Sequence, residues 1–246
     1  MKPPAYIAAH IRRVLKDGGS APHAEGVQRF FKEEVASRGW YTAELRQLAV
    51  RFRRVLLKEH GLAYMVAVAD QLFRGRVLEE KAMAVLLLEK SVADFGTKEF
   101  RLFESWLDRV SSWADHDALA HYLLAPMLVS DPARVRAVLG WARSRKRWRR
   151  RAAAVALIRG ARRKIFEREI ARLTEMLLCD GDDLVQKGLG WLLREHAKAD
   201  AGRAVPLLMK IRERAPRLVL RTACETLSPE TRAQVLGDGT RAARAS

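Results

Sequence analysis

The spacing of turn-forming residues constrains most strongly how this chain can fold. Gly, Asp and Pro residues interrupt the sequence at intervals of about one helix, or roughly 12–20 residues. Between them apolar residues recur at spacings of three and four, and strand patterns are nearly absent. This pattern predicts an all-α fold, an α-solenoid in which each helical pair packs on its neighbours, with a generic helical bundle as the alternative. The turn positions are Asp17 to Gly19, Gly39, Gly61, Gly75, Gly96, Ser130 to Pro132, Gly160, Asp180 to Asp182 and Ala215-Pro216.

Three segments resemble the turn-to-helix signature of HEAT repeats, Asp-x-x-Val-Arg/Lys. They are residues 182–187, 131–136 and 148–153. Stacked pairs of this kind curve into a concave surface, and a basic concave surface fits a nucleic-acid duplex. The pattern fades near Ser228, so we expect one repeat domain over 1–227 and a short C-terminal helix or frayed basic tail over 228–246.

The stretch 143–151, Arg-Ser-Arg-Lys-Arg-Trp-Arg-Arg-Arg, places seven basic residues around one tryptophan. It runs directly into the apolar segment 152–158, so it belongs to an ordered helix. Lys and Arg total 46 against 29 Asp and Glu, which gives a net charge of +17. Charge so dense on an ordered element predicts a polyanionic partner, first of all nucleic acid. Consecutive helical residues diverge by about 100°, so some of these side chains must be solvated instead.

The sequence argues against a membrane protein and against a metal site. No apolar run reaches the roughly 20 residues of a membrane span, and the N-terminus lacks the apolar core of a signal peptide. Cys179 and Cys224 lie in apolar helical patterns, which is typical of buried thiols, so we expect a cytoplasmic protein. Phosphate-loop, His-x-x-x-His and Gly-x-Ser-x-Gly motifs are absent, and the histidines are expected at the surface or at helix caps. We therefore expect no cofactor and no metal.

Two tryptophans carry charged residues at one-turn spacing. Trp113 and Asp117 are four residues apart, so in a helix they share one face. Ser112 and Asp115 fit a helix N-cap and its reciprocal partner, and the alternative to catalysis for Asp117 is a favourable interaction with the helix dipole.

Lys187, Trp191 and Arg194 also share one helical face, turned away from the neighbouring leucines. A tryptophan beside two cations and away from the core favours a binding role, with a structural cation–π pair as the alternative.

The chain resembles the AlkD-type DNA alkylation repair glycosylases, which are built from HEAT-like repeats. The most specific similar segment is 186–198, Gln-Lys-Gly-Leu-Gly-Trp-Leu-Leu-Arg-Glu-His-Ala-Lys. The others are Phe30-Phe31-Lys32-Glu33 with Gly39-Trp40, Thr42 to Leu48, Glu80-Lys81-Ala82, Trp113-x-x-x-Asp117 and Trp148-x-x-Arg151-Ala152-Ala153. Together these segments cover most of the chain.

The resemblance implies a C-shaped solenoid that grips duplex DNA in a basic groove. It implies hydrolysis of the N-glycosidic bond of cationic N3- and N7-alkylated purines, in base excision repair, by a monofunctional and monomeric enzyme. Asp117 would be catalytic, and Trp113 and Trp191 would face the lesion. The resemblance places Phe30 where the family can have a tyrosine and Tyr41 where it has a glutamine. The residues expected to bind DNA are Phe30, Tyr41, Arg149, Arg150, Arg151, Lys187 and Arg194, with Arg151 and Arg194 on phosphates.

The sequence leaves other functions open. A non-catalytic nucleic-acid-binding HEAT-repeat protein would bind in a salt-sensitive way and release no base. A protein-binding scaffold would present its basic face to an acidic partner. Among enzymes, the departures at Phe30 and Tyr41 also leave open a role against bulky adducts rather than methylated purines.

Overall fold

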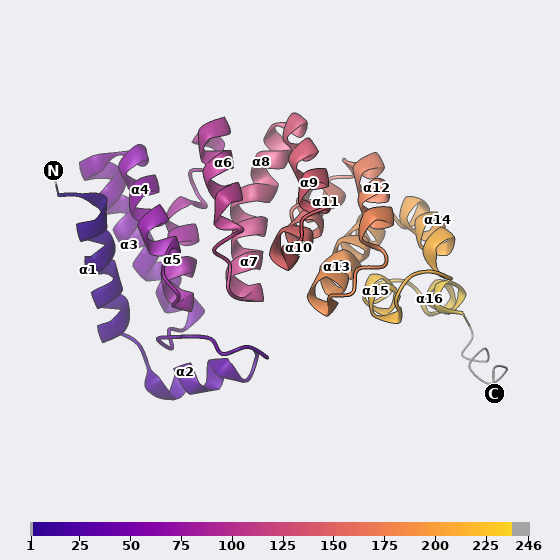
Figure 1. Cartoon of the computed structure of the whole chain (residues 1–246), viewed down its shortest axis with the longest axis horizontal. Helices are drawn as coiled ribbons and strands as arrows, with labels where there is room; N and C mark the ends of the chain where they lie inside the picture. Colours follow the sequence, from indigo (N-terminus) through magenta and orange to yellow (C-terminus); the bar gives the residue numbers. More distant parts are fainter. Residues whose placement is uncertain (1, 238–246) are drawn as a thin grey trace. The chain divides into compact units, whose positions relative to one another are not determined.

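A computed structural model describes residues 2–237, and over this range every regular element is a helix (Figure 1). This confirms the predicted all-α fold, and within each unit the helices pack on their neighbours as in the predicted α-solenoid. The chain divides into two compact units, residues 1–127 and residues 128–246. The single repeat domain expected over 1–227 stays a prediction, and the part of the expected tail at 238–246 lies outside the described residues.

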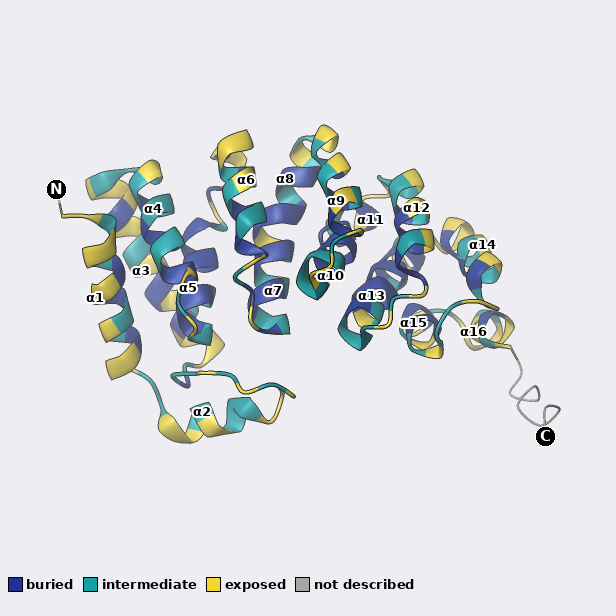
Figure 2. Cartoon of the chain, viewed as in Figure 1, coloured by how far each residue is buried: buried dark blue, intermediate teal, exposed yellow. Residues whose placement is uncertain are grey.

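The first unit packs its helices around an apolar interior. Helix α4 contacts α1, α3 and α5, and α5 also contacts α7. The buried rings of Phe73 and Trp106 stack at 4.4 Å between centroids, and Phe103 meets Trp106 edge-on at 5.2 Å. Figure 2 shows the buried residues on the facing sides of these helices. The elements are α1 (Pro4–Asp17), α2 (Ala21–Gln28), α3 (Thr42–His60), α4 (Leu62–Phe73), α5 (Leu78–Leu88), the 3-10 turn η1 (Val92–Asp94), α6 (Thr97–Trp106), α7 (Trp113–Leu119) and the π-helical turn η2 (Ala120–Leu124).

The second unit is organised around one long helix, α13, which contacts α10, α11, α12, α14 and α15. Helix α16 packs on α14 and α15 and buries Val235, so the first part of segment 228–246 is an ordered helix. The boundary between the units falls in α8 (Ala125–Ser130). The remaining elements are the 3-10 turn η3 (Pro132–Arg134), α9 (Val135–Trp141), α10 (Arg147–Val155), α11 (Ile158–Arg162), α12 (Glu167–Leu177), α13 (Asp183–Ala199), α14 (Ala201–Ile211), α15 (Arg217–Ala223) and α16 (Pro229–Leu236).

Most of the predicted turns coincide with helix ends. Helix α1 ends just before Gly18, and α13 begins after Asp182, whose carboxylate accepts a hydrogen bond from Leu184 N at 2.9 Å. The turn predicted at Gly160 is wrong, because this glycine lies inside α11. A Cβ there would lie 2.2 Å from the Phe166 ring, so Gly160 allows a close approach of that ring.

The structure corrects the expectation that both cysteines are buried. Cys224 is buried, and burial raises the pKa of its thiol, but Cys179 is exposed because it follows the last turn of α12.

Among residues 2–237, no helix is long and apolar enough to cross a membrane.

His196 of α13 is a buried histidine that should couple stability to pH. Its side chain is 4% exposed, and its Nδ1 atom makes no hydrogen bond among the described residues. Burial lowers the pKa of His196, although the negative charges of Glu167 and Asp200 act in the opposite direction. As pH falls, the unfolded chain, in which the pKa of His196 is 6.5, binds a proton before the folded chain does. The stability that neutral His196 contributes is therefore lost as pH falls below 6.5.

We expect His196→Gln to flatten the decrease in stability between about pH 7.5 and about pH 5.5, measured by the urea midpoint at each pH. The control is His10→Gln, which changes an exposed histidine of α1 and should keep the pH dependence of the wild type. Identical pH dependence in wild type and His196→Gln would show that His196 does not couple protonation to folding.

Candidate functional site

Helix α7 begins with a capping box, as its sequence predicts. The Asp115 carboxylate accepts hydrogen bonds from the backbone N of Ser111 at 3.0 Å and of Ser112 at 2.7 Å. The Ser112 hydroxyl also donates to Asp115, and its oxygen accepts from the backbone N of Asp115. Asp115 therefore has the capping role expected of it.

A buried lysine joins this cap to α5. Lys81 is 2% exposed, and its Nζ atom lies 2.8 Å from Asp115 Oδ2. The same ammonium donates to the backbone O of Arg109 at 2.6 Å and to Ser111 Oγ at 2.8 Å. All three contacts lie at the start of α7, so Lys81 fixes the position from which the helix projects. In the sequence Lys81 is recognisable only as part of a family-like segment, because its partners lie 28 to 34 positions away.

Trp113 and Asp117 both lie on the half-buried side of α7, as their spacing predicts, whereas Asp115 is buried. The Asp117 side chain is 20% exposed, so its carboxylate reaches the surface. The π-helical turn η2 follows α7 directly, and such turns are frequent at functional sites.

His116 departs from the prediction that the histidines lie at the surface or at caps. Its side chain is fully buried, because it lies on the side of α7 that faces the core with Leu119. Its Nδ1 atom is 2.6 Å from Asp117 Oδ1. The prediction is also wrong for His196, which is buried in the second unit.

An aromatic segment from the N-terminal part of the chain covers Trp113. The ring of Phe31 stacks on the Trp113 ring, with 4.9 Å between centroids and 17° between planes. Trp113 Nε1 also donates a hydrogen bond to the backbone O of Phe30 at 3.4 Å. The Phe30 side chain itself is 75% exposed, which is unusual for so large an apolar group. Phe31 was not singled out from the sequence as a site residue, since nothing local connects it to Trp113.

The segment that carries these rings is anchored by the buried carboxylate of Glu79. Glu79 accepts hydrogen bonds from Ser37 Oγ at 2.7 Å and from the backbone N of Arg38 and Gly39 at 2.8 and 2.9 Å. Gly39 has a φ of 75°, in the left-handed region that favours glycine. A Cβ at Gly39 would also lie 1.9 Å from the backbone O of Ser20. The loop therefore has one defined path from α2 to α3.

Tyr41 ends this segment and precedes α3. Its side chain is 56% exposed and stacks on His23 of α2, with 4.0 Å between ring centroids. In the first unit, Trp113 thus contacts Phe31 and the backbone of Phe30, and Asp117 lies one turn further along α7. Tyr41 lies at the other end of the same loop.

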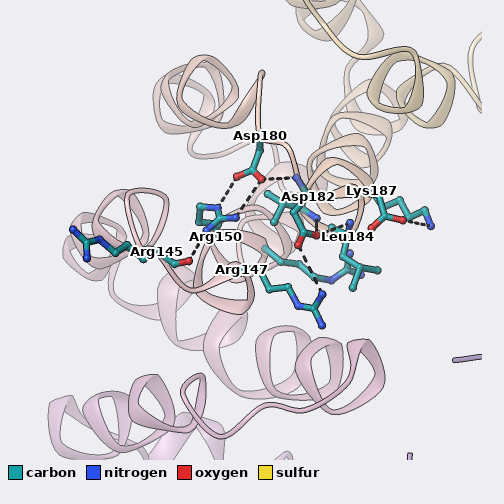
Figure 3. A network of polar contacts seen from close by, with 10 residues as sticks. Arg145, Arg147, Arg150, Asp180, Asp182, Leu184 and Lys187 are labelled. Carbon is teal, nitrogen blue, oxygen red and sulfur yellow. Dashed lines mark hydrogen bonds and ion pairs between the residues drawn. The ribbon is translucent and has the colours of Figure 1, made fainter. Parts of the chain in front are cut away.

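In the second unit, acidic residues already bind part of the basic stretch (Figure 3). Arg150 Nε lies 2.6 Å from Asp180 Oδ2, and Arg147 Nη1 lies 3.9 Å from Asp182 Oδ2. The Arg147 guanidinium also lies 4.8 Å from the centroid of the Trp148 ring.

Arg151 is more buried than its predicted contact with a phosphate would suggest. The residue is 6% exposed, and Nη1 donates to the backbone O of Leu184 at 2.5 Å. A Cβ on Gly188 would lie 3.2 Å from Arg151 Cγ, so this side chain packs between α10 and α13. The phosphate contact stays a prediction, and Arg151 has a structural role in addition.

The exposed basic residues of the stretch are those before α10. Arg143, Arg145 and Lys146 are exposed, and Arg149 is half-buried. Figure 3 shows the Arg145 side chain extending away from Asp180. In this part of the second unit, these exposed side chains are the best placed to bind a polyanion.

Helix α13 carries the second tryptophan group on the side opposite its core leucines. Leu189, Leu192 and Leu193 are fully buried, whereas Trp191 and Arg194 are half-buried and Lys187 is exposed. Lys187 Nζ lies 3.5 Å from Asp183 Oδ2. Arg194 pairs with Glu225 at 2.5 Å and with Glu195 at 3.5 Å, so a phosphate would compete with these carboxylates.

The predicted residues thus fall into two groups, one in each unit. Within residues 2–237 no cluster of His, Cys, Asp and Glu side chains could hold a metal ion. The first unit places the partly exposed carboxylate of Asp117 one turn from Trp113, and the second places Trp191 on one helical face with Lys187 and Arg194.

Comparison with known proteins gives one family and one fold. Residues 11–227 match the model of a family described as DNA alkylation repair enzyme. No curated protein matches the chain. Among solved structures, the chain is similar to a predicted DNA alkylation repair enzyme from Enterococcus faecalis, with a TM-score of 0.77 and 15% sequence identity. The similarity covers 86% of this chain and 97% of that one, and at this identity it shows the fold alone.

Proposed function

The chain belongs to the DNA alkylation repair enzyme family, and from this premise we propose that it is a DNA glycosylase. Its substrates would be 3-methyladenine, 7-methylguanine or bulkier N3 and N7 adducts of purines in duplex DNA. The observation that carries the proposal is the partly exposed Asp117 carboxylate one turn from Trp113, which stacks on Phe31. Binding a phosphate backbone alone would need neither the carboxylate nor the stacked rings.

The chemistry of these lesions suits a single carboxylate. An N3- or N7-alkylated purine is cationic, so it leaves as a neutral base that carries the bonding electron pair and needs no protonation. Positive charge then builds on the deoxyribose, as in other glycosyl transfers through oxocarbenium-like states. The Asp117 carboxylate would stabilise this charge and orient the water whose oxygen bonds to C1′, while that water's proton passes to solvent.

Aromatic faces add a preference for a cationic base. The Trp113 ring would attract the positive charge of the alkylated purine and of the developing sugar cation. Trp191 of the second unit would offer the same preference for a cation. The exposed Phe30 and Tyr41 would lie against the DNA strands, and Arg194, Lys187 and the exposed residues before α10 would hold phosphates. The proposed reaction needs no metal, no cofactor and no second copy of the chain.

The proposal is tested by the release of free base from methylated duplex DNA. Incubation with excess protein should release 7-methylguanine or 3-methyladenine, detected by chromatography, and leave unmethylated duplex intact. Salt-sensitive binding to DNA without release from any alkylated substrate would favour the non-catalytic alternative. Indifference to DNA at low salt would favour a scaffold for an acidic protein.

The basic stretch makes a separate prediction about DNA binding. We expect Arg145→Ala to reduce the slope of log K against log salt by about 1, because this exposed side chain is available to a phosphate. The matched control is Arg150→Ala. The sequence also predicted DNA binding at Arg150, but Asp180 already binds that guanidinium, so this variant should leave the slope near the wild-type value. Fluorescence anisotropy titrations at several salt concentrations measure both slopes. Equal reductions in the two variants would contradict the distinction.

A further inference from the structure

We propose that His116 is a positioning residue that holds the Asp117 carboxylate toward the reacting sugar. This inference rests on the proposed glycosylase function. Its direct observation is the distance of 2.6 Å between His116 Nδ1 and Asp117 Oδ1, from an imidazole that is fully buried to a carboxylate that is 20% exposed.

The contact is unusual for residues adjacent in a helix. Consecutive helical side chains diverge by about 100° and do not ordinarily face each other. For these two atoms to meet, the Asp117 side chain must lean toward the buried flank of α7, where His116 lies. The carboxylate is therefore held in one orientation at the boundary between core and surface.

The hydrogen bond engages one oxygen of the Asp117 carboxylate. An ionised carboxylate only accepts hydrogen bonds, so His116 Nδ1 must carry the proton that it donates to Oδ1. The contact at Oδ1 fixes the orientation of the whole carboxylate, which reaches the surface where a sugar cation or an attacking water would approach. The imidazole is fully buried, so the donor side of this contact is shielded from bulk water.

Asp115 and Asp117, two residues apart in α7, are held by different partners. The ion pair of Lys81 with Asp115 fixes the backbone at the start of α7, and His116 fixes the side chain of Asp117. A site preorganised in this way needs little rearrangement as charge develops.

The test compares His116→Leu with His116→Asn in single-turnover base release at saturating protein. Leu fills space without donating, whereas the Asn amide nitrogen can take the position of Nδ1. We expect Leu to slow release by about 10- to 100-fold with the Kd for DNA unchanged, and Asn to restore most of the rate. Equal losses in the two variants, or a Leu variant with altered Kd and melting temperature but an unchanged rate, would overturn the proposal.

A second readout does not depend on base release. In proton and nitrogen NMR, the Nδ1–H of His116 should give a protected, downfield resonance in the wild type that shifts or disappears in Asp117→Ala. If this resonance is absent or insensitive to Asp117, the positioning role fails. If it behaves as expected but the wild type releases no base, the contact stands and the glycosylase function fails.

Discussion

Asp117→Asn is expected to slow single-turnover release of the alkylated base by about 10²–10³-fold, while the Kd for methylated duplex DNA stays near that of the wild type. The amide has almost the same shape as the carboxylate but carries no negative charge, so it cannot stabilise the positive charge that develops on the deoxyribose. Binding should persist because the phosphate contacts proposed for the second unit do not involve this residue. Base release by chromatography and binding by anisotropy on the same substrate separate the two effects.

The control for this variant is Asp94→Asn, which makes the same chemical change at an exposed carboxylate in the 3-10 turn η1 of the same unit. It should release base at the wild-type rate. A wild-type rate in Asp117→Asn as well would remove Asp117 from the mechanism, and the proposed glycosylase would then need another group to stabilise the sugar cation.

Lys81→Met is expected to destabilise the first unit by about 3–5 kcal/mol, because it leaves the Asp115 carboxylate buried without its ion-pair partner. The side chains in this pair are only 2% and 1% exposed, so water cannot replace the missing ammonium. The loss is a large share of the roughly 5–15 kcal/mol that stabilises a typical domain. Chemical denaturation followed by circular dichroism measures it.

Two further variants test whether the loss of the ion pair with Asp115 causes the destabilisation. Lys98→Met removes an exposed lysine of α6 and should change stability by less than about 0.5 kcal/mol. The double variant Lys81→Met with Asp115→Asn removes both charges while keeping an acceptor for the cap, so it should recover part of the loss. A double variant less stable than Lys81→Met would show that the buried charge of Asp115 is not the cause.

Most of the predicted turns were confirmed because they depend on local signals, and Gly160 shows where such signals fail. Gly18 and Asp182 end or cap helices because turn and capping preferences depend on neighbouring residues. Gly160 is also a glycine between apolar segments, but it lies inside α11. A glycine is needed there because the ring of Phe166, six positions ahead, approaches its backbone closely. Periodicity likewise assigned Trp113 and Asp117 to one face without any tertiary information.

The supporting residues of the site could not be predicted in this way. Phe31, Glu79 and Lys81 act through partners that are distant in the sequence, and no local pattern identifies them. Charge counting also overstated the basic stretch, because Asp180 and the backbone O of Leu184 already bind Arg150 and Arg151. The roles of these side chains follow only from tertiary contacts.

The stacking of Phe31 on Trp113 has a consequence for the order in which the first unit can fold. Neighbouring helices of a solenoid meet through short chain separations, whereas the hydrogen bond from Trp113 to Phe30 closes a span of 83 positions. Contacts between distant positions form late because the intervening chain must first be ordered. During synthesis Trp113 emerges long after Phe31, so the stacking of these two rings cannot form until α7 has been made. The aromatic covering of α7 therefore cannot form in any fragment that ends before this helix.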